Sequence, residues 1–446
     1  MAEQRFSHDF STLQQLARDV LAHARLKGAS ACEVDVSEGF GQSVSVRCGE
    51  VETIEHNREK GVGVSVYVGQ RRGHASTSDF SPRALRETVE AALNIARFTA
   101  EDDCAGLPEP ELLARETMDL QLYHPWELSV EDAIELARRC EAAAFDVDER
   151  ISNSEGATIS TQQGQFVAAN SLGFMGGYPT SRHYIACSVI AGEQEAMQRD
   201  DWYTTHRDAA RLDSPESVGQ RAARRALARL EPRKIVTGSY PVIFEAPLAA
   251  GLLGNFVQAV SGGALYRKST FLLDHLGKPV FPGFFQLSER PHLPGGLASS
   301  PFDNDGVATR DREVVRDGIL EGYFLSVYSG RKLGMPSTGN AGGSHNLILR
   351  PGEHDLEGLL RLMGRGVLVT ELLGHGVNYV TGDYSRGAAG FWVEDGQIVH
   401  PVEEITIAGN LKDMFRNLRA VGRDVQVRGS KQTGSLLLEA MTVAAG

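Results

Sequence analysis

Two long stretches of this chain alternate polar and apolar residues in short runs that glycine interrupts. The first covers residues 32–78 and the second residues 150–205. Such alternation is typical of strands with one buried face, and glycine permits the tight turns between them. The chain has 48 glycines among 446 residues, which also favours a strand-rich protein. We therefore expect an antiparallel meander over the first stretch and further strands over the second.

Helical periodicity separates these strand-like stretches. Apolar residues recur at helical spacing in four segments, at residues 10–28, 82–98, 129–147 and 215–230. The segment EPRKIVTGS, residues 231–239, then divides the chain, and we place a domain boundary between residues 232 and 233. The expected fold class is α+β, and residues 1–232 are expected to form an N-terminal α+β domain with a meander sheet and flanking helices.

The second half, residues 233–446, is expected to be mostly antiparallel β. It opens with a strand from Tyr240 to Phe244 and a helix from Leu248 to Val260 that is apolar on almost every side. Asp-Gly pairs favour two-residue hairpin turns, and they occur at residues 317–318 and 395–396.

Two further segments of this half are less regular. Residues 410–422 read as a helix that Asn410 caps and Gly422 ends. Residues 277–306 are rich in proline and too long for a plain connection, so they form either an ordered functional loop or a mobile flap.

Charge and composition exclude several classes of function. The formal charge is 45 − 58 = −13, and an acidic surface repels nucleic acid. The most basic run, residues 221–233, is interpreted as a solvated helix face. No stretch has the run of about 18 apolar residues that a membrane span needs, and no secretory signal is visible at the N-terminus. We expect a cytoplasmic protein with no nucleic-acid or membrane partner.

The cysteines fit this location. They form an odd set without a CxxC pair, which is typical of buried free thiols in a reducing compartment: Cys32, Cys48, Cys104, Cys140 and Cys187.

Few residues offer metal or nucleophilic chemistry. The 13 histidines include neither HExxH nor HExxxH. Glu371 and His375 are the best remaining pair, because the i, i+4 spacing would place them on one face of a helix. Gly374 and Gly376 flank the histidine, and one pair leaves a metal ion underligated, so a structural or substrate-contacting role is favoured. An independent metal hydrolase that uses this pair remains an alternative.

Other motifs are incomplete. GGALYRKST, residues 262–270, has Arg267 where a P-loop requires its second glycine, and no GxSxG is present. Two polar, glycine-rich segments are either well-bonded turns or contacts to a peptide or partner. They are Asp383, Tyr384, Ser385 and Arg386 in GDYSRGAAG, and residues 337–346, which include Asn340 and His345.

Several segments together resemble the TldD/PmbA family. They include ISTQQGQFVAANSLGF, AVSGGALYRKSTFLLDHLGKPVF, STGNAGGSHNL and GDYSRGAAGFWVEDGQIVHPVEEITIAGNLKDMF, and they extend from about residue 40 to the C-terminus. The resemblance implies a cytoplasmic peptidase built from two paralogous subunits. It also implies that the second half curls into a barrel- or sandwich-like body at the dimer interface.

The family's catalytic subunit carries HExxxH on a helix that follows a strand, and a late cysteine as third zinc ligand. Here Glu245, Ala246 and Ala250 stand in place of the first histidine, the glutamate base and the second histidine. Arg428 stands in place of the cysteine. Alanine neither binds zinc nor moves a proton, so this pattern resembles the PmbA (TldE) subunit type. It implies no catalytic residue and no cofactor in this chain, with zinc in the partner.

The expected function is therefore that of a zinc-free subunit of a TldD-type metalloprotease that processes unfolded peptides. The expected partner is an HExxxH-bearing TldD-like paralogue, although a homodimer is possible for the chain alone. A homodimeric peptide-binding scaffold without proteolytic function is the alternative. The candidate contacts to peptide or partner are Glu371, His375, Asp383, Tyr384, Ser385, Arg386, Asn340 and His345.

Overall fold

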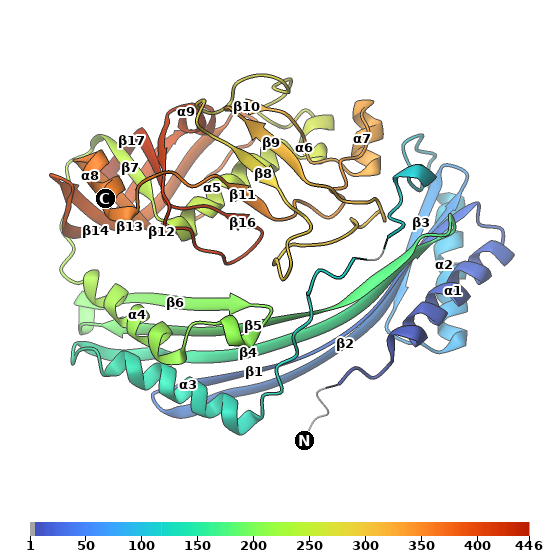
Figure 1. Ribbon diagram of the computed structural model, residues 1–446, viewed down its shortest axis with the longest axis horizontal. Helices are drawn as coiled ribbons and strands as arrows, with labels where there is room; N and C mark the ends of the chain where they lie inside the picture. The colour runs from blue at the N-terminus through green and yellow to red at the C-terminus, as the bar shows by residue number, and fades with distance from the viewer. Residues whose placement is uncertain (1–4, 117, 446) are drawn as a thin grey trace.

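The computed structural model describes residues 5–116 and 118–445. The first half builds one long, curved antiparallel sheet, and the second half lies over its concave side (Figure 1). The strand order is β3-β2-β1-β4-β5-β6. The bounds are β1 (Ala31–Arg47), β2 (Glu50–Val68), β3 (Arg71–Thr77), β4 (Ile151–Asn170), β5 (Met175–Ala191) and β6 (Gln198–His206). The two alternating stretches thus form two meanders, which join where β1 pairs with β4.

All four helices expected in the first half are present, each with a Ser or Asp side chain that caps its first turn. They are α1 (Phe10–Leu26), α2 (Pro82–Phe98), α3 (Val130–Phe145) and α4 (Pro215–Ala228). Helices α1 and α2 cover one end of the sheet, and α3 and α4 cover the other (Figure 1). Helices α3 and α4 pack closely, since a Cβ at Gly219 would lie 1.9 Å from the carbonyl oxygen of Cys140.

The second half contains a closed five-stranded barrel, as the family resemblance implied. Its order is β14-β13-β12-β7-β17, and β14 pairs with β17 to close the ring. The bounds are β7 (Gly238–Phe244), β12 (Gly366–Leu373), β13 (Asp383–Glu394), β14 (Gln397–Asn410) and β17 (Leu436–Ala445), with β15 (Leu418–Val421) beside β17. Helix α5 (Ala246–Ala259) buries Leu252, Leu253 and Phe256 in the core that these strands share.

A second, smaller sheet completes this half. Its order is β10-β9-β8-β11-β16, with bounds β8 (Leu287–Glu289), β9 (Arg312–Arg316), β10 (Ile319–Leu320), β11 (Leu347–Leu349) and β16 (Lys431–Gln432). The remaining helices are α6 (Gly262–Tyr266), α7 (Val327–Leu333), α8 (Leu356–Met363) and α9 (Leu411–Arg416). Within the described ranges, no helix is long and apolar enough to cross a membrane.

The two Asp-Gly hairpins are confirmed. Asp317 and Gly318 have φ of 49° and 75°, and Asp395 and Gly396 have φ of 50° and 73°. Two consecutive positive φ values are what a type I′ turn requires. These turns connect β9 to β10 and β13 to β14.

Three local expectations are wrong. The helix that Asn410 caps ends at Arg416, because Leu418–Val421 pairs with β17 as strand β15, so Gly422 ends no helix. Residues 383–386 are not a turn but the first residues of β13, which pairs with β14. The thiols are free, but Cys48 is exposed and Cys104 is half-buried.

The proline-rich segment is an ordered loop that joins the two halves. Phe302 packs on the sheet, with its ring centroid 5.1 Å from that of Phe174 and 5.8 Å from that of Tyr178. Arg207, at the end of β6, donates hydrogen bonds to the carbonyl oxygens of Gly296 (2.9 Å) and Leu297 (3.0 Å). These contacts favour an ordered loop over a mobile flap.

Candidate functional site

Helix α5 begins where the barrel meets the sheet of the first half. Strand β7 runs parallel to β12, and the backbone N–H of Glu245 donates to the carbonyl oxygen of Val369 as the chain leaves β7. The N–H of Ala246 donates to Ser435 Oγ at 3.0 Å. The Glu245 side chain does not cap the helix, although it stands at the N-cap position. It pairs instead with a residue of α4.

Five charged residues meet at this point, and we name them the interdomain ionic cluster: Asp200 on β6, Arg225 on α4, Arg229 just after it, Glu245 before α5, and Glu371 on β12. Arg225 Nη1 lies 2.7 Å from Glu245 Oε1, and its Nε lies 3.1 Å from Asp200 Oδ1. Arg229 Nη2 lies 2.5 Å from Glu371 Oε2. The cluster therefore ties α4 and the sheet edge to the barrel through alternating charges.

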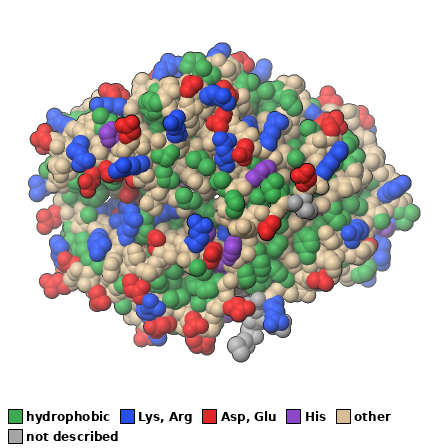
Figure 2. All heavy atoms as spheres, viewed as in Figure 1, with side chains coloured by type: hydrophobic (Ala, Val, Ile, Leu, Met, Phe, Trp, Pro, Cys, Tyr) green, Lys and Arg blue, Asp and Glu red, His purple; other side chains and the backbone are tan. Residues whose placement is uncertain are grey.

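The cluster is largely shielded from water. The side chains of Asp200, Glu245 and Arg225 are 10%, 12% and 19% exposed. Burial lowers the pKa of Arg225, but Glu245 and Asp200 outweigh it and raise that pKa above its ordinary value. The cluster lines a cavity of about 220 Å³ between the halves. Figure 2 shows a hollow between the two halves on the left of the view, with basic side chains in it.

The structure corrects the interpretation of the basic run at residues 221–233. Arg225 and Arg229 do not belong to a solvated face, because they are largely buried against acids of three other elements. A signal for this was available in the sequence. Arg221, Arg225 and Arg229 recur every four residues beside the buried Ala222 and Ala226, which places them at the edge of the buried stripe.

Zinc does not fit the residues at the positions that the family resemblance assigns to its ligands. Zinc takes imidazole, thiolate or carboxylate ligands. Ala246 and Ala250 supply none of these, and the Glu245 carboxylate already pairs with Arg225. The guanidinium of Arg428 lies 3.9 Å from the ring centroid of Trp202 and 4.0 Å from that of Tyr203. The structure thus has a cation and an ion pair at the positions where the resemblance would place metal ligands.

Glu371 and His375 do not share a helix face. Glu371 is on strand β12 and pairs with Arg229, whereas His375 is exposed in the segment that follows the strand. A shared face required this segment to be helical, and it is not. The charge of Glu371 is used to join the halves.

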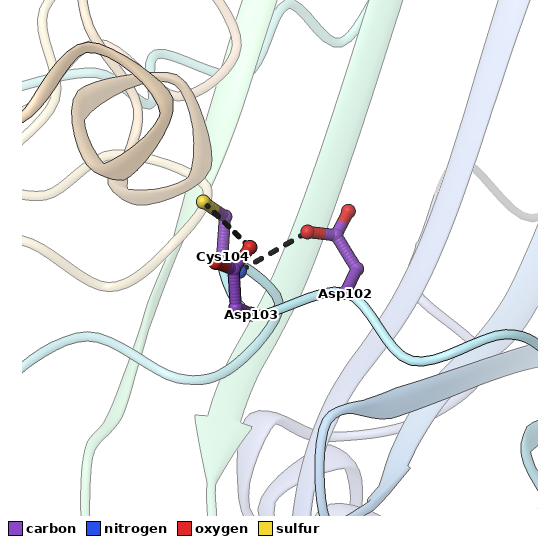
Figure 3. Close-up of side chains that lie close together, drawn as sticks. All are labelled: Asp102, Asp103 and Cys104. Carbon is purple, nitrogen blue, oxygen red and sulfur yellow. Dashed lines mark hydrogen bonds between the residues drawn. The ribbon is translucent and has the colours of Figure 1, made fainter.

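One grouping of possible ligand atoms was found among residues 5–116 and 118–445, formed by Asp102, Asp103 and Cys104 (Figure 3). It lies outside the α5 region. The Asp102 carboxylate already accepts a hydrogen bond from Tyr328 at 2.7 Å and pairs with Lys332 at 2.9 Å. This carboxylate therefore links the loop that contains residues 102–104 to α7.

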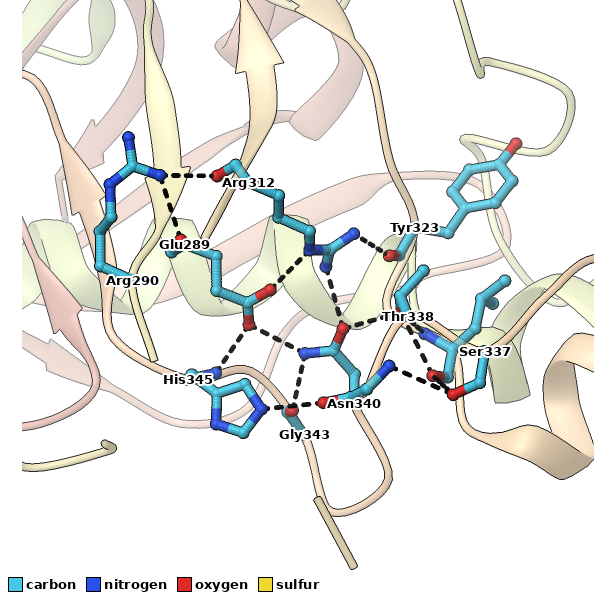
Figure 4. Close-up of polar contacts among 11 residues, drawn as sticks. Glu289, Arg290, Arg312, Tyr323, Ser337, Thr338, Asn340, Gly343 and His345 are labelled. Carbon is cyan, nitrogen blue, oxygen red and sulfur yellow. Dashed lines mark hydrogen bonds and ion pairs between the residues drawn. The ribbon is translucent and has the colours of Figure 1, made fainter. Parts of the chain in front are cut away.

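Asn340 and His345 lie in a buried polar network around Glu289 (Figure 4). The Glu289 carboxylate accepts hydrogen bonds from Arg312 Nε (2.6 Å), Asn340 Nδ2 (2.8 Å) and the backbone N–H of His345 (2.8 Å). The His345 ring donates to the carbonyl oxygen of Gly339 at 2.8 Å. These bonds hold the glycine-rich loop in place, and contact with peptide or partner stays a prediction for both residues.

The residues at the start of β13 differ in exposure. Asp383 and Ser385 are exposed, and the Asp383 carboxylate accepts a hydrogen bond from Thr381 Oγ1 at 2.6 Å. Tyr384 is buried in the barrel core against Phe244. Arg386 is half-buried, and its Nε has no hydrogen-bond partner in the described part of the chain. Peptide or partner contact stays a prediction here as well.

Comparison with known proteins covers nearly the whole chain. Family models for the PmbA/TldA metallopeptidase match as domain 1 (residues 32–96), central domain (123–230) and C-terminal domain (237–445). Metalloprotease PmbA of Escherichia coli O157:H7 is 51% identical over 424 residues, 95% of this chain and 94% of that protein. A PmbA homolog of Haemophilus influenzae is 50% identical over 433 residues, 97% of this chain and 96% of that protein.

The fold also matches solved structures over nearly the whole chain. The crystal structure of a putative modulator of DNA gyrase from Bacteroides thetaiotaomicron has a TM-score of 0.92 at 28% identity, covering 97% of this chain and 99% of that one. TldE from Thermococcus kodakarensis shares the fold, with a TM-score of 0.85 at 21% identity over 96% of this chain and 100% of that one. A TldD homolog of Buchnera aphidicola is 19% identical over 83% of this chain and 81% of that protein. The chain therefore belongs to the TldD/PmbA family of metallopeptidases and has PmbA-type relatives along almost its full length.

Proposed function

We propose that this chain is the zinc-free, PmbA (TldE)-type subunit of a cytoplasmic two-subunit metalloprotease that acts on unfolded peptides. The observation that carries the proposal is the start of α5. Glu245 pairs with Arg225 at 2.7 Å, Ala246 and Ala250 offer no ligand, and the Arg428 guanidinium lies against the rings of Trp202 and Tyr203. These residues stabilise the junction of the two halves, while the metal chemistry falls to the partner, a TldD-like paralogue that carries HExxxH.

The architecture supports a role in holding peptide. Strand β6 lies at the edge of the long sheet and faces the barrel (Figure 1). An extended peptide binds a sheet edge through main-chain hydrogen bonds, which suits substrates without fixed sequence. Asp383 and Ser385 on β13 and His375 after β12 are exposed, and they remain candidate peptide contacts.

Co-expression with an HExxxH-bearing paralogue tests the proposal. We expect the two chains to co-elute in size-exclusion chromatography, and the complex to hydrolyse an unfolded peptide faster than either chain alone. A variant of the paralogue without its glutamate base is the matched control, which should assemble but not hydrolyse. If no complex forms and this chain adds nothing to hydrolysis, the proposal is wrong and a scaffold without proteolytic function is favoured.

A further inference from the structure

A second cavity adjoins the interdomain ionic cluster at Pro247 and Arg428. Its volume is about 310 Å³. Its walls come from the edge strand at Tyr203, the first turns of α5 at Ala250 and Gly251, and the segment that leads into β16, with Arg428 and Lys431. We name this cavity the cationic pocket, since its described lining contains two cations and no carboxylate.

Small residues keep this pocket open. A Cβ added at Gly251 or at Gly429 would meet no atom within 4 Å. Ala250 presents only a methyl group at the position where the family's catalytic subunit carries its second histidine. The chain thus retains a hollow beside α5 that its own side chains do not fill.

Arg428 is held rigidly at the border of this hollow. Its guanidinium stacks on Trp202 and Tyr203, and Nη2 donates to the carbonyl oxygen of Tyr203 at 3.1 Å. Its own carbonyl oxygen accepts from Arg182 at 2.9 Å. A guanidinium has five N–H donors in a fixed plane, so donors remain for a ligand. Burial lowers the pKa of Arg428, although Tyr203, Asp201 and Glu245 partly offset this effect.

Lys431 is the second cation. Its alkyl chain lies against α5, where a Cβ at Gly254 would be 3.6 Å from Lys431 Cε. Its Nζ contacts Ser430 Oγ at 3.4 Å, a long hydrogen bond. Burial lowers the pKa of Lys431 as well. Neither Lys431 nor Arg428 forms an ion pair with any described residue, in contrast to Arg225 and Arg229 in the adjoining cluster.

Two half-buried cations line the cationic pocket, and neither has an ion-pair partner among the described residues. Burying an unpaired charge is costly, and an anionic ligand would reduce that cost. Arginine binds a carboxylate through two parallel N–H donors, and lysine adds a point charge. We propose that the cationic pocket binds a carboxylate group of an extended peptide. The inference rests on the proposed peptide-handling function and adds a charged anchor to it, at the place where the paralogue would hold its metal.

The carboxylate has two possible sources, the C-terminus of the peptide and an acidic side chain. Three fluorescent versions of one short, otherwise uncharged peptide distinguish them: the free acid, the C-terminal amide, and the amide with a single internal glutamate. Binding to the purified full chain is measured by fluorescence anisotropy. We expect one of the two carboxylate-bearing peptides to bind at least about tenfold more tightly than the plain amide, the size of effect for one charge-assisted hydrogen bond.

Variants locate the effect. Lys431→Met should weaken binding of the preferred peptide by about tenfold or more, and Lys431→Arg should retain it. Lys412→Met, which removes an exposed lysine on α9, is the control and should change nothing. Thermal unfolding of each variant verifies that it is folded. The comparison of the three peptides needs no variant, so it tests the proposal even if Lys431→Met fails to fold.

Equal binding of all three peptides would overturn the inference, and so would unaltered binding by folded Lys431→Met. Displacement of the peptide by inorganic phosphate at an equal concentration would also overturn it, because it would indicate a site for any small anion. Assembly with the paralogue is measured separately. A chain that assembles and supports hydrolysis yet binds acid and amide alike refutes only this inference. A chain that discriminates between them but never assembles refutes only the proposed function.

Discussion

The interdomain ionic cluster allows a quantitative test of how the two halves are joined. In the variant Arg225→Met, Glu245 loses its ion-pair partner, and Asp200 keeps only Arg229, with Oδ2 and Nη1 3.8 Å apart. Removing one member of a buried ion pair costs about 3–5 kcal/mol, because the other charge stays buried without compensation. We expect a loss of about 3 kcal/mol in the free energy of unfolding, at the lower end of this range, since the side chains involved retain some exposure.

The variant Glu245→Gln should cost less, about 1–2 kcal/mol, because Arg225 keeps Asp200 and the amide oxygen still accepts a hydrogen bond. In the double variant, the neutral amide that replaces the Glu245 carboxylate leaves no unpaired charge at that position. The two losses should therefore sum to more than the loss of the double variant, by about 1–2 kcal/mol.

Equilibrium urea unfolding followed by tryptophan fluorescence measures these differences. Arg83→Met is the matched control, because Arg83 and Glu87 also lie 2.7 Å apart but are 83% and 63% exposed. Exposed pairs contribute little to stability, so this variant should unfold as the unaltered chain does. If Arg225→Met and Arg83→Met have the same effect, burial of the cluster does not determine its energy and the reasoning is refuted.

Two further predictions concern pH and packing. Burial, with a smaller contribution from Asp305, raises the pKa of Asp303 from 3.8 to about 7. Between about pH 4 and pH 7 the folded chain holds a proton that the unfolded chain has released. The free energy of unfolding should therefore fall as the pH rises through this range, by up to about 1.4 kcal/mol per pH unit. Urea unfolding at several pH values should show a flatter pH dependence for Asp303→Asn than for the unaltered chain. Gly219→Ala should lower the melting temperature, because its Cβ would lie 1.9 Å from the carbonyl oxygen of Cys140, whereas Gly251→Ala, whose Cβ meets no atom within 4 Å, should not. An unchanged melting temperature for Gly219→Ala would contradict the close packing of α3 and α4.

Local sequence signals predicted the elements that depend on local physics. Asp-Gly turns require two positive φ values and little else, so both hairpins were predictable. The helices of the first half follow in the same way from the spacing of their apolar residues. The strand from Leu418 to Val421 was not predictable from local signals, because the segment becomes a strand only through pairing with β17.

The candidate site depended on contacts that are distant in sequence. Asp200, Arg225 and Glu371 lie on three elements, and nothing within any one of them shows that they meet. Their charges alone are typical of solvated faces, and that was the interpretation of the arginines. The start of α5 was predicted instead from its resemblance to a zinc-binding helix, in which Glu245, Ala246 and Ala250 stand in place of two histidines and a glutamate.

We propose that this chain supplies no zinc site of its own. Metal analysis by mass spectrometry of the purified chain, of the HExxxH-bearing paralogue and of their complex tests it most directly. We expect a negligible zinc content for this chain alone and about one zinc ion for each paralogue chain in the complex, bound by its two histidines and a third ligand. A full equivalent of tightly bound zinc on the isolated chain, lost in Glu371→Ala or His375→Ala, would contradict it.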